Sequence, residues 1–161
     1  MNASAADFSD FLQTIANEAE LVQRFVELLT QEQAILTEGK IDELPSLADK
    51  KEKLATELNT LTRLRSQYLT SQGYTADRPG MQAWSSKHPE HQQALASWDK
   101  TLTLAAQAKE LNRLNGQLIQ LRMQYNSQAL EILRRKDNPL DLYGPDGRSS
   151  LQGDRKINDV V

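Results

Sequence analysis

The stretch that decides the fold is residues 90–138, EHQQALASWDKTLTLAAQAKELNRLNGQLIQLRMQYNSQALEILRRKDN, which contains no proline. Apolar residues recur in it every three or four positions, which predicts one long helix over residues 89–136. The main stripe along this helix consists of Leu95, Trp98, Leu102, Ala105, Lys109, Asn112, Gly116, Ile119, Met123, Asn126, Leu130 and Leu133. A second stripe beside it consists of Leu104, Ala108, Leu111, Asn115, Leu118, Tyr125, Ala129 and Ile132, and Leu114 and Leu121 add to its width. The C-terminal half is therefore apolar over more than one seam.

Residues 5–38 carry a regular pattern of the same kind. Its steps alternate between four and three, as in the seam of a coiled coil, and only one member is polar. Ser4 with Asp7 can cap the start of this helix, and Gly39 is well placed to end it. The predicted seam consists of Phe8, Leu12, Ile15, Ala19, Val22, Val26, Leu29, Gln33 and Leu36.

A further helix is predicted over residues 43–72. Asp42 is a good N-cap residue, Pro45 falls in the first turn, where its missing N–H costs little, and the helix should stop near Gly73. Lys51 and Arg65 interrupt its seam, and we expect their stems to lie on apolar neighbours while their charges reach water. The seam consists of Leu44, Leu47, Lys51, Leu54, Leu58, Leu61, Arg65 and Tyr68.

Residues 73–88 are predicted to form a loop, with room for one short helix around residues 81–85. Gly73, Pro79, Gly80 and Pro89 mark the segment as a connection. We expect Trp84 within it to seal one end of the bundle.

The composition favours helices over a compact globular core. The chain has 161 residues, a formal net charge of −3, 6% aromatic residues and no cysteine. The absence of cysteine excludes disulfides and thiolate metal sites and fits an intracellular protein. The N-terminus does not resemble a secretion signal, and no stretch approaches the roughly 20 apolar residues of a membrane span. The predicted class is all-α: an elongated antiparallel three-helix, coiled-coil-like bundle over residues 1–136, with a long third helix and a disordered tail over residues 137–161.

The helix lengths predict an overhang. At about 1.5 Å per residue the three helices measure roughly 50, 45 and 70 Å, so the third exceeds its neighbours by roughly 20–25 Å. The excess falls on about residues 120–136, the part with surplus apolar surface. An exposed apolar helical face of this kind usually binds another protein. A break that folds this part back, or a homodimer that covers it, is the alternative.

The stretch NRLNGQL, residues 112–118, places poor helix formers inside the longest helix. Gly116 costs up to about 1 kcal/mol in helix propensity, and we expect it to let another helix cross at close range. Asn112 and Asn115 can hydrogen-bond across that crossing, because a polar residue on a seam can fix register. We therefore predict a registration point or a bend made by Asn112, Asn115 and Gly116; a tolerated kink is the alternative.

The tail after Lys136 loses this periodicity. It contains Leu140, Leu142 and Tyr143, which so short a segment cannot bury alone. A Gly-Pro-Asp-Gly turn follows them, and together they predict a linear docking motif. The alternative is that Tyr143 folds back on the long helix.

No chemistry of catalysis or metal binding is evident in the sequence. His88 and His91 are its two histidines, and their spacing straddles Pro89 without an acidic partner, so we predict no zinc site and no cofactor. Glu18 and Glu20 are expected on polar faces of the first helix, solvated rather than catalytic. Charge runs from −6 over residues 7–38 to +3 over residues 90–136, without the concentrated basic face of a nucleic-acid binder. An enzyme is therefore not predicted.

Residues 112–133, followed by LYGPDG, resemble the FlgN family of flagellar export chaperones. The specific pieces are the N-x-x-N-G run of Asn112, Asn115 and Gly116, and the pattern N-x-x-A-L-x-x-L that begins at Asn126. The tail, with Leu142, Tyr143 and Gly144 followed by Asp146 and Gly147, is similar to the family's ending. A weaker likeness runs through Leu36, Gly39, Leu44, Lys51, Leu54 and Arg65.

The resemblance implies a cytoplasmic bacterial chaperone of the flagellar type III export system. Its clients would be hook-associated proteins, which form the hook–filament junction. It would hold their C-terminal helical region, prevent early assembly and deliver them to the export gate, with no nucleic acid and no membrane insertion. Leu142, Tyr143 and Gly144 would dock on the cytoplasmic domain of that gate.

Client binding in the family lies in the C-terminal part, which agrees with the overhang. The predicted client-binding residues are Leu118, Ile119, Leu121, Met123, Tyr125, Asn126, Ala129, Leu130, Ile132 and Leu133. Since they cannot all face one partner helix, helix rotation or a wrapped client is needed. A structural coiled-coil scaffold that acts through homodimerisation is the alternative function.

Overall fold

The computed structural model describes residues 4–137, with side chains over residues 4–134. Within that range the chain forms four α-helices and no strand: α1 (Ala5–Glu38), α2 (Leu44–Ser71), α3 (Arg78–Lys87) and α4 (Gln92–Asp137). Short 3-10 turns, η1 (Ile41–Glu43) and η2 (Pro89–His91), precede α2 and α4. The predicted all-α class is confirmed.

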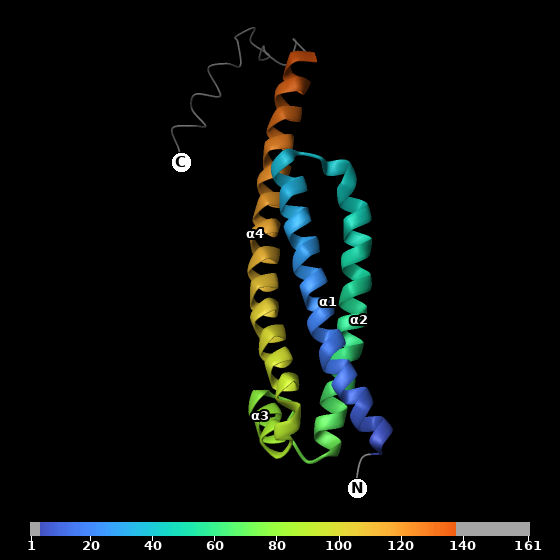
Figure 1. The fold of residues 1–161 in the computed structure, drawn as a ribbon. Coiled ribbons are helices and arrows are strands. Elements are labelled where there is room, and N and C mark those ends of the chain that lie inside the picture. The colour runs from blue at the N-terminus through green and yellow to red at the C-terminus, as the bar shows by residue number, and fades with distance from the viewer. Residues whose placement is uncertain (1–3, 138–161) are drawn as a thin grey trace. The chain divides into compact units, whose positions relative to one another are not determined.

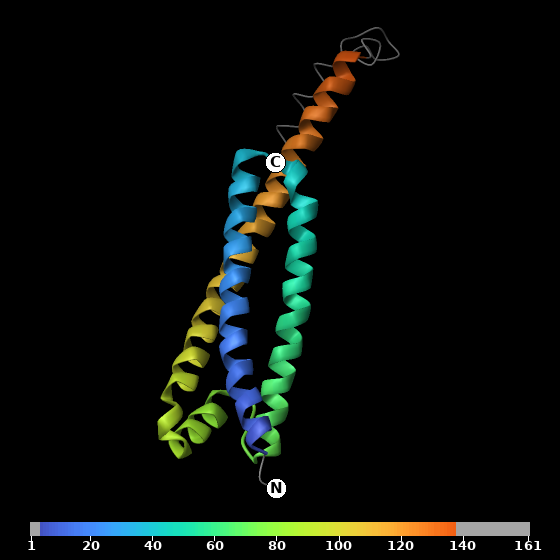
Figure 2. The same ribbon diagram turned by 45° about the vertical axis from the view of Figure 1, so that its right-hand side comes forward.

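The chain divides into two compact units inside α4. The first, Met1–Leu118, is called the bundle unit, and the second, Ile119–Val161, the C-terminal unit. In the bundle unit α1 and α2 run antiparallel, and the first part of α4 runs back beside α1 (Figures 1 and 2). The division lies close to residue 120, where the predicted surplus of apolar residues begins.

Local sequence signals set most helix ends. The Asp7 amide donates to the Ser4 hydroxyl (3.1 Å) and the Ser4 amide to the Asp7 carboxylate (3.0 Å), which confirms the predicted capping box of α1. Gly39 ends α1 with φ 80°, a left-handed conformation that glycine adopts without strain. Gly73 follows α2 with φ 83°, close to its predicted end. The predicted N-cap of α2 is wrong: Asp42 lies inside η1, and Glu43 occupies the cap without a side-chain hydrogen bond.

The segment predicted as a loop contains the ten-residue helix α3, which is longer than the short helix allowed for there. Asp77 caps it by accepting from the Gly80 amide (3.0 Å), and the same carboxylate oxygen accepts from the Thr75 hydroxyl, which lies before the helix. These hydrogen bonds, the one from Thr75 first, hold the pKa of Asp77 below its ordinary value. Trp84 is fully buried, as expected, in a cluster with Phe11 and Ile15 of the first half of α1. Its helix, α3, lies at the end of the bundle unit where α1 begins (Figure 1).

Two apolar clusters form the core of the bundle unit. The end cluster consists of Phe11, Ile15, Leu69, Met81, Trp84, Ala94 and Trp98. The middle cluster joins α1 to α4 and consists of Val22, Val26, Leu29, Leu104 and Ala108. Because α2 buries only Leu47, Arg65 and Leu69, it contributes little apolar area to the middle of the bundle unit.

The inward face of α4 differs from the predicted one. Leu102, Ala105 and Lys109 of the main stripe are exposed, whereas Leu104, Ala108 and Asn115 of the second stripe are buried. Packing the main stripe would have buried the Lys109 ammonium, which is costly without a partner. The second stripe offers leucine and alanine to α1 instead.

The seam of α1 is also shifted in part. Phe11, Glu18 and Glu32 are buried, while the predicted members Leu12 and Ala19 are only half-buried. Sequence reasoning missed both glutamates because it assigns carboxylates to the solvent face; their partners on other helices make the burial tolerable.

Candidate functional site

A buried ion pair joins α1 to α2 in the bundle unit. Arg65 Nε donates to Glu18 Oε2 at 2.8 Å and Arg65 Nη2 to Glu18 Oε1 at 3.3 Å. The Thr62 hydroxyl donates to the same carboxylate at 3.0 Å, and the guanidinium lies 3.8 Å from the centre of the Trp98 ring. Both charged side chains are at most 5% exposed. The expectations that Arg65 sends its charge to water and that Glu18 is solvated are therefore wrong.

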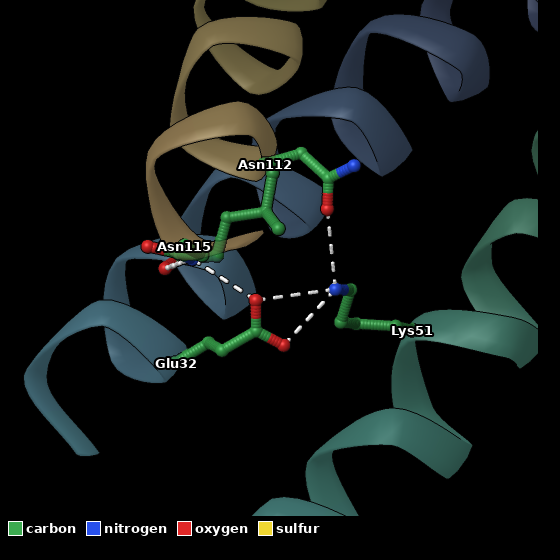
Figure 3. A network of polar contacts seen from close by, with 5 residues as sticks. Glu32, Lys51, Asn112 and Asn115 are labelled. Carbon is green, nitrogen blue, oxygen red and sulfur yellow. Dashed lines mark hydrogen bonds and ion pairs between the residues drawn. The ribbon is translucent and has the colours of Figure 1, made fainter. Parts of the chain in front are cut away.

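A second polar layer joins α1, α2 and α4 (Figure 3). Lys51 Nζ donates to both carboxylate oxygens of Glu32, at 3.2 and 3.0 Å, and to Asn112 Oδ1 at 3.4 Å. Asn115 is fully buried, and its amide nitrogen donates to Glu32 Oε1 at 3.0 Å and to the Leu29 carbonyl at 2.9 Å. Lys51 is only partly exposed and is held by Glu32, so its charge is not simply solvated.

The two ion pairs, Arg65–Glu18 and Lys51–Glu32, fit only one register between α1 and α2. Glu18 and Glu32 lie two heptads apart in α1, and Lys51 and Arg65 lie two heptads apart in α2. Antiparallel helices therefore match both pairs only in one alignment. A slip of one heptad in either direction sets one of the carboxylates opposite Leu58, whose side chain can neither pair with the charge nor hydrogen-bond to it. This equal spacing of opposite charges on two predicted helices is the signal that sequence reasoning missed.

The three predicted registration residues differ in the contacts that they make with other helices. Asn112 and Asn115 both hydrogen-bond across helices, while Asn112 itself is exposed. The expected close crossing at Gly116 is wrong, because a Cβ built there would meet no atom within 4 Å. Gly116 is exposed, and α4 continues through it. A register role for the asparagines remains a prediction.

The C-terminal unit carries a long row of exposed apolar side chains on α4. Tyr125 is 74% exposed, Leu130 67% and Met123 66%. All of the predicted client-binding residues from Ile119 to Leu133 are exposed, and only Leu118, which belongs to the bundle unit, is half-buried. The residues that complete this set are Ile119, Leu121, Asn126, Ala129, Ile132 and Leu133.

No metal or membrane chemistry emerges from residues 4–137. His88 Nδ1 lies 2.8 Å from the Trp84 carbonyl and its ring stacks on the Trp84 indole, while the His91 ring packs on Phe8. In that range no three His, Asp or Glu residues gather as a metal site would require, and no helix is long and apolar enough to cross a membrane. The predicted gate-docking residues Leu142, Tyr143 and Gly144 lie outside the described residues.

Comparison with known proteins gives consistent matches. The model of the FlgN protein family matches residues 1–150. The flagella synthesis protein FlgN of Yersinia enterocolitica is 35% identical over 151 residues, which cover 91% of this chain and 95% of that protein. The FlgN of Proteus mirabilis is 29% identical over 151 residues, which cover 90% and 94%.

A crystal structure of a Pseudomonas aeruginosa chain described as a FlgN flagella synthesis protein is similar in fold. The TM-score is 0.66, and the match covers 74% of this chain and 90% of that one. At 22% identity this likeness shows the helical fold alone.

Proposed function

Because the chain belongs to the FlgN family and so takes part in flagellum synthesis, we propose that it is an export chaperone for hook-associated proteins. In the cytoplasm it binds the C-terminal helical region of such a client, prevents premature assembly and delivers the client to the flagellar export gate. The family membership supports the flagellar role, and the surface of the C-terminal unit supports the binding role.

One observation carries this proposal: α4 presents seven large apolar side chains to solvent between Ile119 and Leu133. Contiguous exposed apolar surface on a protein usually marks a protein–protein contact. An amphipathic client helix can lay its apolar face on part of this set of residues, as in other helix-in-groove complexes. The same contact would hide the apolar face through which the client assembles, which is the physical basis of the chaperone role.

The docking step is assigned to Leu142, Tyr143 and Gly144, on the strength of the family resemblance. Changing Tyr143 to Ala should reduce binding to the cytoplasmic domain of the export gate and leave client binding unchanged. Loss of both activities, or of neither, would contradict separate roles for the tail and α4.

The decisive experiment replaces Leu130 and Leu133 together by Asp. Two carboxylates on the apolar face should abolish pull-down of the C-terminal helical region of a hook-associated protein, because a buried unpaired charge is strongly unfavourable. Helix content by circular dichroism should not change, since both side chains are exposed. The matched control changes Gln120 and Gln124, which are exposed on the polar side of α4, to Asp. Equal binding by the two variants would reject the proposal.

Light scattering of the free protein separates the chaperone from a homodimeric scaffold. A chaperone whose α4 face awaits a client should be a monomer that gains the mass of one client. A dimer whose mass does not depend on client would support the scaffold instead.

A further inference from the structure

The large exposed apolar residues described in the C-terminal unit lie on two separate lines along α4, with Ala129 and Arg122 between these lines. The first line, called the first seam, consists of Ile119, Met123, Leu130 and Leu133, with Asn126 between them. The second seam consists of Leu121, Tyr125 and Ile132. Within each seam the steps are three, four or seven residues, which is the spacing of a coiled-coil contact line.

The two seams point in different directions. At 3.6 residues per turn, their centres lie roughly 140° apart around the helix, and together they span an arc of roughly 200°. The remaining arc is polar and consists of Gln120, Gln124, Ser127, Gln128, Glu131 and Arg134. A helix that packs against one neighbour buries an apolar stripe roughly 100° wide. One partner helix can therefore cover one seam and must leave the other in water.

The apolar area argues that both seams are used. Seven large side chains that are 38–74% exposed offer roughly 800 Å² together, which is what one protein contributes to a standard stable interface. A single seam would supply about half of that area, in the range of weak contacts.

We propose that the C-terminal unit receives two helices at once, both supplied by one partner molecule, in a three-helix contact over residues 119–133. This inference rests on the proposed function and specifies what the client presents: a pair of amphipathic helices whose apolar stripes meet between them. The seams occupy the same four turns, so the two incoming helices must lie next to each other as well as on α4. Helices that belong to one partner lose the translational and rotational freedom of association once, whereas two separate partners lose it twice. A second copy of this chain in a symmetric pair brings one α4 and fills one seam.

Site-directed labels can count the helices, because the chain has no cysteine of its own. Three variants each receive one nitroxide: Met123→Cys on the first seam, Tyr125→Cys on the second, and Gln124→Cys on the polar arc as control. The probe is the C-terminal helical region of a hook-associated protein, added to saturation, with the mass of the complex measured by light scattering. We expect the electron paramagnetic resonance spectra of the labels at positions 123 and 125 to show immobilisation in a one-to-one complex. The label at position 124 should stay mobile.

Each other outcome rejects part of the reasoning. Immobilisation at one seam only would overturn the two-helix proposal and leave the chaperone function standing. A complex that forms without immobilising either label would overturn both the two-helix proposal and the proposed binding of the client to α4. Immobilisation of both labels in the free protein would mean that the chain or its copies already cover the seams, and this would overturn the proposal. A complex with two partner molecules per chain would exclude a single donor of both helices, and this would overturn the proposal as well.

Affinities provide an independent measurement. Met123→Gln with Leu130→Gln weakens the first seam, and Leu121→Gln with Ile132→Gln weakens the second, while glutamine keeps helix propensity. Each pair should raise the Kd for the same probe at least about 10-fold, as loss of buried anchors does. The control variant is Ser127→Gln with Gln128→Ala, on the polar arc. Its Kd should stay within about twofold of the original value, which corresponds to a change in binding free energy of less than RT. A seam whose variant binds like the control receives no helix.

Discussion

Replacing Arg65 by Met should destabilise the bundle unit far more than an ordinary surface change. The variant keeps the apolar stem over Trp98 but leaves the Glu18 carboxylate, 5% exposed, with the Thr62 hydroxyl as its remaining donor. An uncompensated buried charge of this kind costs about 3–5 kcal/mol. A typical domain has about 5–15 kcal/mol of stability, so the variant should retain its fold with a much lower urea midpoint.

The assay is urea unfolding followed by circular dichroism, because the midpoint and slope separate a change of stability from a change of the unfolded state. The matched control is Arg24→Met, which breaks the pair with Glu20, where both side chains are more than half exposed. Exposed pairs contribute about 0–1 kcal/mol. If Arg65→Met loses no more than Arg24→Met, the carboxylate of Glu18 is solvated and the argument from burial fails.

The double variant Glu18→Leu with Arg65→Met completes the cycle. Replacing a whole buried ion pair by apolar residues is often neutral or stabilising by about 1–4 kcal/mol. We therefore expect the double variant to recover most or all of the stability that Arg65→Met loses. A double variant as unstable as the sum of its single changes would show that the pair does not act as a unit.

Four further predictions concern single positions. Gly116→Ala should stabilise the protein by up to about 1 kcal/mol in urea unfolding, because alanine is the better helix former and its Cβ meets no atom; Gly80→Ala should destabilise it, since a Cβ there would overlap the Thr75 carbonyl. Asn115→Asp should destabilise more than Asn115→Ala, because it replaces a buried donor by a carboxylate at the position that contacts Glu32; tolerance of the aspartate would contradict the buried layer. The folded-state pKa of Asp77 is lowered, so its contribution to stability is present above the unfolded pKa of about 3.9 and is lost as pH falls through the folded value. Urea unfolding of Asp77→Asn, followed by tryptophan fluorescence as the pH is lowered, should lack that loss of stability.

The sequence alone determined the three long helices and most of their ends. Capping by Ser4 and Asp7, termination at Gly39 and the break near Gly73 depend on backbone conformation and on hydrogen bonds that span three or four residues. The surplus apolar surface after Leu118 is likewise visible as a change of pattern along one helix. Sequence reasoning missed the length of α3, because its proline and glycine favour a loop. The helix is favoured by the burial of Trp84, which depends on tertiary packing.

The tertiary structure alone decided which faces turn inward. Whether Glu18 is solvated or buried depends on Arg65, which lies 47 positions further along the chain, and whether Asn115 is satisfied depends on Glu32, 83 positions away. No local rule distinguishes a carboxylate in water from one opposite a guanidinium, because the free energy of burying a charge is set by its partner. The same reason explains why α4 packs through its second stripe: the choice depends on what α1 and α2 present to it.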